Sequence, residues 1–243
     1  MGDRGKQNMD DACLLAVFAH PDDETFRPGG TLALLARNGV RVETLIFTRG
    51  GAGSCGDPPL CTLAELPAVR ERELRCACNA LSIQPPRLLD YADGHLQEAD
   101  SEKMIAHILS IAHENKPQVW LSFGPDGLSG HPDHLAVSRW TAEAFRRTGE
   151  VAVQYTVAIP QSLAQGLDMR QVRPVPDDTI ALTVDVSPVW EAKVAAMRCH
   201  ATQWSSLPLA HAPEERRRLF FGREYFVRAA SRGINAGFLP AIL

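Results

Sequence analysis

Apolar runs alternate with segments of helical periodicity along most of the chain. Cys13–Phe18 is an uninterrupted apolar run, which is typical of a strand buried on both faces of a parallel sheet. Thr31–Arg37 has the pattern of a helix that ends at Gly39, and Val40–Thr48 has the pattern of the next strand. A strand, a helix and a strand within about fifty residues predict a βαβ unit with a right-handed crossover.

The same alternation continues toward the C-terminus. Further strands are predicted at 87–90, 119–123, 151–159, 180–186 and 224–227, and helices at 65–81, 101–114, 134–147, 188–200 and 214–220. Loops are predicted at 49–60 and 124–133, and we find no internal repeat or linker. The pattern predicts a single α/β domain over residues 1–243, with a doubly wound, Rossmann-like, mostly parallel sheet and helices on both faces.

Composition excludes several classes of partner. The chain has 243 residues and a formal net charge of −4, which leaves no basic surface for nucleic acid. No apolar run approaches the roughly 20 residues needed to span a bilayer. The polar segment Met1–Asp11 lacks the apolar core of a secretory signal. We therefore expect a cytoplasmic protein that binds neither nucleic acid nor membrane.

The six cysteines fall into three groups: Cys13 and Cys199 in apolar or helical surroundings, Cys76 and Cys78 on one predicted helix, and Cys55 and Cys61 around a Gly-Asp-Pro-Pro loop. The first group is expected to be core thiols. The second pair points to different faces of its helix and is not expected to share a metal. The third pair could form a disulfide in an oxidising compartment, and we expect it to be reduced in the cytoplasm.

A glycine motif after the second predicted strand suggests a dinucleotide site. Residues Gly51–Gly56 match G-x-G-x-x-G. That fingerprint needs a helix that begins at the glycines and points its N-terminus at the pyrophosphate. Pro58 and Pro59 follow directly and forbid a helix there. We expect a loop that forms one wall of a substrate site, with a nucleotide-dependent enzyme as the alternative.

The end of the first predicted strand carries a crowded acidic motif. Ala19–Glu24 has the sequence Ala-His-Pro-Asp-Asp-Glu, in which a histidine and three carboxylates follow one another closely. These acceptor groups would repel one another unless a positive charge lay between them. A metal ion would supply that charge, and imidazole and carboxylate ligands suit zinc. A solvated acidic turn at a helix N-terminus explains the motif equally well.

A second histidine motif favours the metal. Gly130–His134 has the sequence Gly-His-Pro-Asp-His and follows the predicted strand at 119–123. The carboxyl ends of parallel strands meet at one edge of the sheet, where α/β proteins bind their ligands. Two clusters of metal-ligand side chains at that edge, in a chain with eight histidines, predict a metal site.

These two motifs resemble those of the LmbE-like (PIG-L) superfamily, whose members are zinc-dependent deacetylases that hydrolyse N-acetylglucosamine amides. The resemblance covers most of the chain and also includes Gly29-Gly30-Thr31, Thr48-Arg49-Gly50, Arg70, Glu73, Ala77, Leu81, Lys193, Met197, His200, Thr202 and Gln203. Three positions depart from the family pattern. Gly51 stands where an acid is common, Ser82 replaces a usual glycine, and Thr202 replaces a usual serine.

The resemblance implies that His20, Asp23 and His134 are the zinc ligands. Three protein ligands leave one position open for water, which is the mark of a catalytic zinc site. Zinc can lower the pKa of that water to about 7. Asp22 is then expected to be the general base that accepts the proton of the water. Iron(II) could occupy the same set of two histidines and one carboxylate.

Further roles follow from the same resemblance. His131 is expected to be protonated and to hydrogen-bond the developing oxyanion. Asp133 is expected to fix the tautomer of His131 and keep its pKa high, or only to cap the turn. Glu24 is expected to cap the next helix or to support a ligand from behind. The expected substrate-binding residues are Arg70, His200, Gln203 and Trp204, with a solvated helix face as the alternative for Arg70.

The expected substrate is a small-molecule glycoconjugate. The loop from Gly50 to Leu66 and the segment 204–209 suit a large, partly aromatic molecule. They resemble the members of the family that act on glycopeptide-antibiotic pseudoaglycones, and we expect that substrate. The alternatives are chitobiose or a thiol-cofactor precursor, either glucosaminyl-inositol or glucosaminyl-malate. A metal- or sugar-binding module without catalysis is the alternative from another class.

Overall fold

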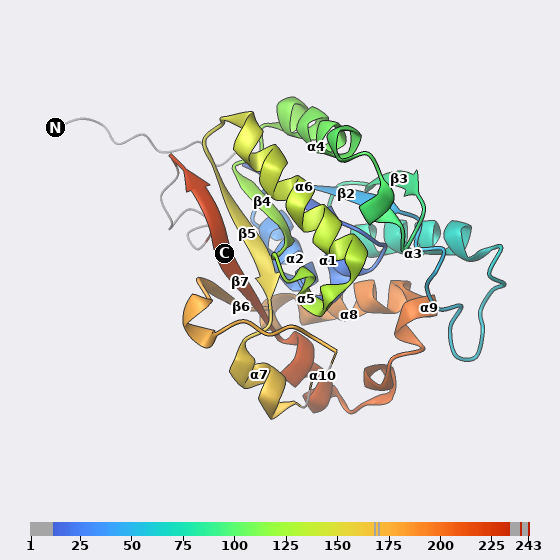
Figure 1. The fold of residues 1–243 in the computed structure, drawn as a ribbon. Coiled ribbons are helices and arrows are strands. Elements are labelled where there is room, and N and C mark those ends of the chain that lie inside the picture. Colours follow the sequence, from blue (N-terminus) through green and yellow to red (C-terminus); the bar gives the residue numbers. More distant parts are fainter. Residues whose placement is uncertain (1–11, 168, 170, 234–238, 240–242) are drawn as a thin grey trace.

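The computed structural model describes residues 12–167, 169, 171–233, 239 and 243 (Figure 1). Within these residues the strands are β1 (Cys13–Phe18), β2 (Arg41–Thr48), β3 (Arg87–Tyr91), β4 (Val119–Phe123), β5 (Ala152–Ala158), β6 (Leu182–Asp185) and β7 (Arg223–Arg232). Every predicted strand is therefore present. The sequence-based expectation for Met1–Asp11 lies outside the described residues.

The described strands form one seven-stranded sheet in the order β3-β2-β1-β4-β5-β7-β6. Strands β1 to β5 pair in parallel, whereas β7 runs antiparallel to both β5 and β6. All residues of β1, β4 and β5 are buried, as expected for central strands covered on both faces. The first five strands have the order of a Rossmann-like sheet, and the strand that reverses direction comes late in the chain.

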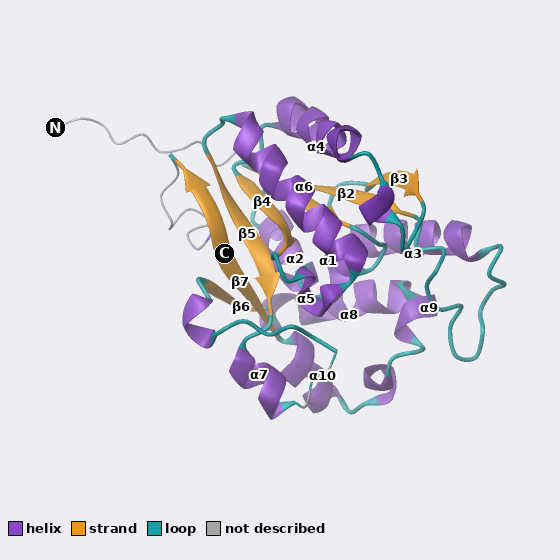
Figure 2. Cartoon of the chain, viewed as in Figure 1, coloured by secondary structure: helices purple, strands orange, loops and turns teal. Residues whose placement is uncertain are grey.

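Helices cover both faces of the sheet (Figures 1 and 2). One layer contains α2 (Gly29–Arg37), α3 (Leu66–Ala80) and α8 (Trp190–Cys199), and the other contains α4 (Ser101–Asn115) and α6 (Pro132–Thr148). This arrangement confirms the doubly wound α/β fold class. None of the helices in the described part of the chain is both long and apolar enough to cross a membrane.

Shorter helices lie between these elements. They are α1 (Asp23–Phe26), α5 (Gly127–Gly130), α7 (Gln161–Gly166), α9 (Ala201–Trp204) and α10 (Glu214–Phe221), with single 3₁₀ turns at 96–98, 177–179, 187–189 and 208–211. The prediction of a loop at 124–133 was wrong in part, because this segment contains α5 and the first residues of α6. Helix α6 begins at Pro132 because the His131 side chain accepts the N–H of Asp133 and proline suits the first helical position.

The end of α3 explains one departure from the family pattern. The N–H of Ser82 donates to the carbonyl of Asn79, and the N–H of Ile83 donates to that of Cys78. This is a Schellman motif, which needs a residue in the left-handed region just after the helix. Ser82 holds that position with φ 58°. Glycine adopts such a φ without steric cost, which is the physical reason for glycine here in the family.

A disulfide joins two helices of the same layer. Cys76 of α3 and Cys199 at the end of α8 are bonded, with 5.6 Å between their Cα atoms and a separation of 123 residues in sequence. The prediction that Cys199 is a core thiol was therefore wrong. Cys13 and Cys78 are buried free thiols, and Cys55 and Cys61 are half-buried and free. The error arose because helical spacing does not show which helices become neighbours.

The centre of the sheet positions both histidine motifs. Strands β1 and β4 are neighbours, and the chain leaves them toward opposite faces, into α2 and α6 respectively. Such a point of divergence opens a crevice at the carboxyl ends of the two strands. The Ala19–Glu24 and Gly130–His134 motifs follow these two strands directly. They therefore meet at one edge of the sheet, as the sequence predicted.

Candidate metal site

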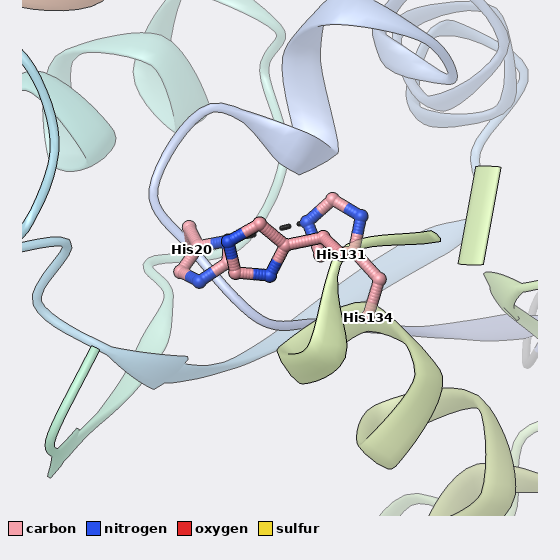
Figure 3. Close-up of side chains that lie close together, drawn as sticks. All are labelled: His20, His131 and His134. Atoms are coloured by element: carbon pink, nitrogen blue, oxygen red, sulfur yellow. Dashed lines mark hydrogen bonds between the residues drawn. The ribbon is translucent and has the colours of Figure 1, made fainter. Parts of the chain in front are cut away.

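Three side chains from the two motifs converge at this edge. His20 Nδ1 lies 3.2 Å from His134 Nε2 and 3.5 Å from Asp23 Oδ2, and His134 Nε2 lies 3.4 Å from Asp23 Oδ1. Figure 3 shows the rings of His20 and His134 facing each other, with His131 beside them. Nitrogens of these three rings lie within 4.8 Å of one another. The structure thus brings together all three side chains that were predicted to hold the metal.

The hydrogen bonds of the two facing rings leave acceptors between them. The other nitrogen of His20, Nε2, lies 2.9 Å from Asp93 and 3.1 Å from Asp133. The other nitrogen of His134, Nδ1, lies 3.0 Å from the carbonyl of Gly127. Each ring therefore uses its N–H on an outer acceptor, as metal-ligating histidines do. The two inner nitrogens then face each other, and either a proton or a metal cation between them satisfies both lone pairs.

The distances also fit a metal. In a tetrahedral zinc site with bonds of about 2.0–2.1 Å, neighbouring ligand atoms are roughly 3.3–3.4 Å apart. The 3.2 Å between the inner nitrogens of His20 and His134 is close to that value. One oxygen of Asp23 lies 3.5 Å from His20, and its other oxygen lies 3.4 Å from His134. Burial lowers the pKa of His20, but Asp133, Asp23 and Asp93 together raise it well above the ordinary value. The carboxylates that favour a proton here would equally favour a metal cation, which competes for the same lone pairs.

Asp22 faces away from these ligands. Its Oδ2 accepts a hydrogen bond of 2.9 Å from Nη2 of Arg70, whereas the next residue, Asp23, faces the two histidines. Burial raises the pKa of Asp22 to about 7; Arg70 opposes this effect and the charge of Asp23 adds to it. A carboxyl group with a pKa near 7 is well suited to proton transfer at neutral pH. The neighbouring acids thus have different partners and different proton affinities.

The expected contact between the Asp133 carboxylate and His131 is absent. The carboxylate is buried and accepts the N–H groups of Gly94 and Leu96, at 2.7 and 2.9 Å, in addition to its contact with His20. Only the backbone N–H of Asp133 reaches His131, where it donates to Nδ1 at 3.2 Å. Burial and the charges of His20 and His134 lower the pKa of His131. Because Nδ1 of His131 accepts a backbone N–H, the ring N–H is placed on Nε2. This hydrogen bond and the lowered pKa run against the expectation that His131 is protonated.

Sequence reasoning missed Asp93. This residue follows β3, lines the same cavity as His20, and lies 2.9 Å from its Nε2. The contact with His20 holds the pKa of Asp93 down to about 2 even though burial raises it. A carboxylate just past a third parallel strand at the same sheet edge was the available signal.

Arg70 is buried, so the solvated alternative for it was wrong. Its guanidinium donates to Asp22 and to the carbonyls of Pro21 and Gly50. The glycine-rich loop leaves space for this side chain: a Cβ at Gly50 or Gly53 would lie 2.2 or 2.5 Å from Arg70 Nη1. The loop glycines therefore accommodate an arginine. No helix begins at them, because α3 starts only at Leu66.

The predicted substrate-binding residues divide into two groups. Arg70 and Gln203 line the cavity at the candidate metal site, and Gln203 holds the glycine-rich loop through two hydrogen bonds with the Ser54 backbone. His200 and Trp204 are buried and line neither the cavity at the candidate metal site nor the larger one beside it. Their burial runs against direct substrate contact, which stays a prediction for these two residues.

Two cavities meet at Asp23. The smaller one has a volume of about 290 Å³ and is lined by the candidate ligands together with Asp22, Arg70 and Gln203. The larger one has a volume of about 900 Å³ and mostly apolar walls. Phe123 is one of its walls, and the ring of this residue stacks on His134 with 4.0 Å between centroids. Most of the remaining wall comes from 157–172 and 207–221, at the ends of α7 and α10.

The comparisons with known proteins agree with these observations. The family model described as PIG-L, GlcNAc-PI de-N-acetylase, matches residues 15–145. A curated relative from Acidothermus cellulolyticus is named 1D-myo-inositol 2-acetamido-2-deoxy-alpha-D-glucopyranoside deacetylase. It is 31% identical over 265 residues, covering 92% of this chain and 91% of the relative.

Solved structures share the fold. The N,N'-diacetylchitobiose deacetylase from Pyrococcus horikoshii superposes with a TM-score of 0.63 at 21% identity, over 93% of this chain and 86% of that one. The 4-carboxy-2-hydroxymuconate hydratase GalB from Pseudomonas putida KT2440 superposes with a TM-score of 0.66 at 18% identity, over 92% and 98%. One fold thus hosts different reactions, and the fold alone does not assign one. The family model and the curated relative place this chain in the PIG-L family.

Proposed function

We propose that this protein is a metal-dependent hydrolase that removes the N-acetyl group from an N-acetylglucosaminyl conjugate. The observation that carries the proposal is the pair of inner imidazole nitrogens of His20 and His134, 3.2 Å apart, whose outer nitrogens are both committed to other acceptors. Asp23 completes a set of three ligands beside a cavity. A centre with three protein ligands is typical of catalytic rather than structural zinc.

His20, Asp23 and His134 would hold the metal, with zinc preferred and iron(II) as the alternative. When bound there, a divalent metal polarises a carbonyl group and makes a water molecule more acidic. Asp93, Asp133 and the Gly127 carbonyl fix the two histidine rings so that their inner lone pairs point at this position. Their role is to orient the ligands before the substrate arrives.

Asp22 is the proposed general base. It lines the small cavity and takes a proton from the attacking water as that water adds to the acetyl carbon. The N–H of His131 Nε2 lies on the same cavity and would donate to the oxygen on which negative charge develops. The carbon–nitrogen bond then breaks, Asp22 returns its proton to the leaving amine, and acetate and the free glucosamine are released.

The proposed substrate is an N-acetylglucosaminyl-inositol rather than an antibiotic. Three curated relatives are 30–31% identical to this chain over 80–94% of its length. Their shared name specifies a deacetylase of a myo-inositol glucosaminide. The teicoplanin and A40926 deacetylases are similar at 16–22% identity, which supports a common fold only. The preference for a glycopeptide pseudoaglycone, which came from the character of two loops, therefore gives way to its alternative.

Acetate release from metal-restored protein tests the proposal. The purified chain is stripped with a chelator, reloaded with Zn²⁺ or with Fe²⁺ under anaerobic conditions, and given N-acetylglucosaminyl-inositol, diacetylchitobiose or pseudoaglycone. We expect acetate only after metal is restored, and the highest kcat/KM with the inositol conjugate. Equal turnover in the presence of excess chelator would contradict metal dependence, and preference for the pseudoaglycone would restore the original substrate expectation.

A further inference from the structure

The backbone of Asp22 has a conformation that residues with a side chain rarely adopt. Its φ is 120° and its ψ is −27°. This geometry directs the carboxylate of Asp22 toward Arg70, while the carboxylate of the next residue, Asp23, faces His20 and His134. Such a conformation persists only where surrounding groups hold it. The groups that hold this backbone conformation therefore keep the proposed base, Asp22, turned away from the proposed metal ligands.

Glu24 holds this backbone from inside the protein. Its Oε2 accepts the N–H of Asp22 at 2.9 Å. The carbonyl of Asp22 also accepts the N–H groups of Thr25 and Phe26, at 2.9 and 3.0 Å, so both peptide groups of Asp22 are fixed. Glu24 is completely buried and lines neither of the two cavities that meet at Asp23. Its carboxylate therefore acts on the backbone and does not reach the substrate.

His200 in turn holds Glu24. This residue lies just after α8, far away in the sequence, and its Nε2 is 2.7 Å from Glu24 Oε1. The hydroxyl of Thr25 donates to the same oxygen. His200 is also completely buried, and its other nitrogen, Nδ1, has no partner in the described structure. The contact with Glu24 thus accounts for a buried polar side chain that has no role at the cavity surface.

We infer that His200 is a positioning residue, which acts through Glu24 to hold the backbone of Asp22 and so aims the catalytic base. The inference rests on the proposed function. It gives a buried residue just after the late helix α8 a specific task in the chemistry at the end of β1. It also explains why Asp22 and Asp23, although adjacent, keep different partners. The contact runs from His200 to Glu24 to the Asp22 N–H and bypasses the metal ligands.

Substitutions in two backgrounds test this role. His200→Leu removes the hydrogen-bond donor and is expected to lower kcat by about 10–100-fold, as loss of a supporting contact does, while KM and metal content stay unchanged. His200→Gln keeps a donor and is expected to recover most of that loss. In an Asp22→Asn background, His200→Leu is expected to change the residual turnover by less than about threefold, because residues that act through one group are not additive.

Met197→Ala is the matched control. Met197 is completely buried on α8 and belongs to the apolar core. The substitution is expected to lower the melting temperature and leave kcat unchanged. A loss of kcat equal to that of His200→Leu would mean that general loosening of α8 explains both, and the inference would be overturned.

Amide hydrogen exchange of the metal-free protein gives a readout that does not depend on activity. His200→Leu is expected to speed exchange at the Asp22 N–H, which Glu24 protects, and Met197→Ala is not. If wild-type protein releases no acetate but this exchange changes as expected, the proposed function fails and the positioning contact stands. If wild-type protein is active and His200→Leu lowers turnover equally in both backgrounds, the positioning role fails.

Discussion

Asp22 and Asp23 are expected to respond differently to the same substitution. Asp22→Asn removes the proposed base but none of the ligands, so turnover is expected to fall by roughly 10²–10⁴-fold with metal content unchanged. Asp23→Asn removes a ligand and is expected to lower the metal content itself. Metal analysis and acetate release on both variants make the comparison. Undiminished turnover in Asp22→Asn would favour a binding module without catalysis.

Arg70 is expected to set the pH range of the reaction. Asp22 must be deprotonated to act as a base, so kcat/KM rises as pH increases through its pKa, which burial raises to about 7. Arg70 lowers that pKa. Arg70→Met is therefore expected to move the acid limb to higher pH by roughly one unit. The measurement is kcat/KM between pH 5 and 9.

Arg72→Met is the control for that profile. Arg72 lies on the same helix, α3, but is exposed. Its pH profile is expected to match that of the wild-type protein. If the acid limb of the Arg70→Met profile stays at the wild-type pH, Arg70 contributes only to the loop structure, through the carbonyls of Pro21 and Gly50.

At the scale of single residues, the sequence predicted those site residues that lie close together along the chain. His20, Asp23 and His134 belong to two short motifs, each directly after an apolar strand, and this placement carried the prediction. Asp93 carried the same signal, since it lies just past β3. The contact between His200 and Glu24 could not be found in this way, because it depends on which elements become neighbours, and the spacing of side chains within one element does not reveal this.

At the scale of secondary structure, the Schellman motif after α3 predicts a stabilising substitution. Ser82→Gly removes the steric cost of φ 58° and is expected to raise the free energy of unfolding by about 0.5–1 kcal/mol. Ser82→Ala keeps a Cβ and is expected to have little effect. Denaturant unfolding of the three proteins gives the comparison. Equal stability of Ser82→Gly and wild type would mean that the strain is relieved elsewhere.

Regular elements were predicted well because their patterns are local. The apolar runs located β1, β2 and β4 to within one residue at each end. The direction of β7 was not predictable, because alternation along a strand is the same in either direction. The short helix α5 was missed because its four residues, which include two glycines and one non-helical φ, carry no periodic pattern.

At the scale of the whole molecule, the pairing of Cys76 with Cys199 makes a simple prediction. Without reductant, the denatured protein is expected to expose four thiols to an alkylating reagent, since two of its six cysteines are bonded. Cys76→Ser is expected to lower the free energy of unfolding by about 2–4 kcal/mol, because the bond closes a long loop. Cys55→Ser is the control. Six reactive thiols would show that the bond does not form.

The two cavities also divide the chain into an early and a late part. The proposed ligands and base all lie within residues 15–145, the region that the family model matches. Most of the wall of the large apolar cavity comes from residues after 145. Evolution could therefore change the accepted molecule without disturbing the reaction. A chimaera that carries only 160–172 and 207–221 of a relative leaves His200 and Gln203 with the host. Selectivity is then expected to follow the graft, and the chemistry to stay with the host.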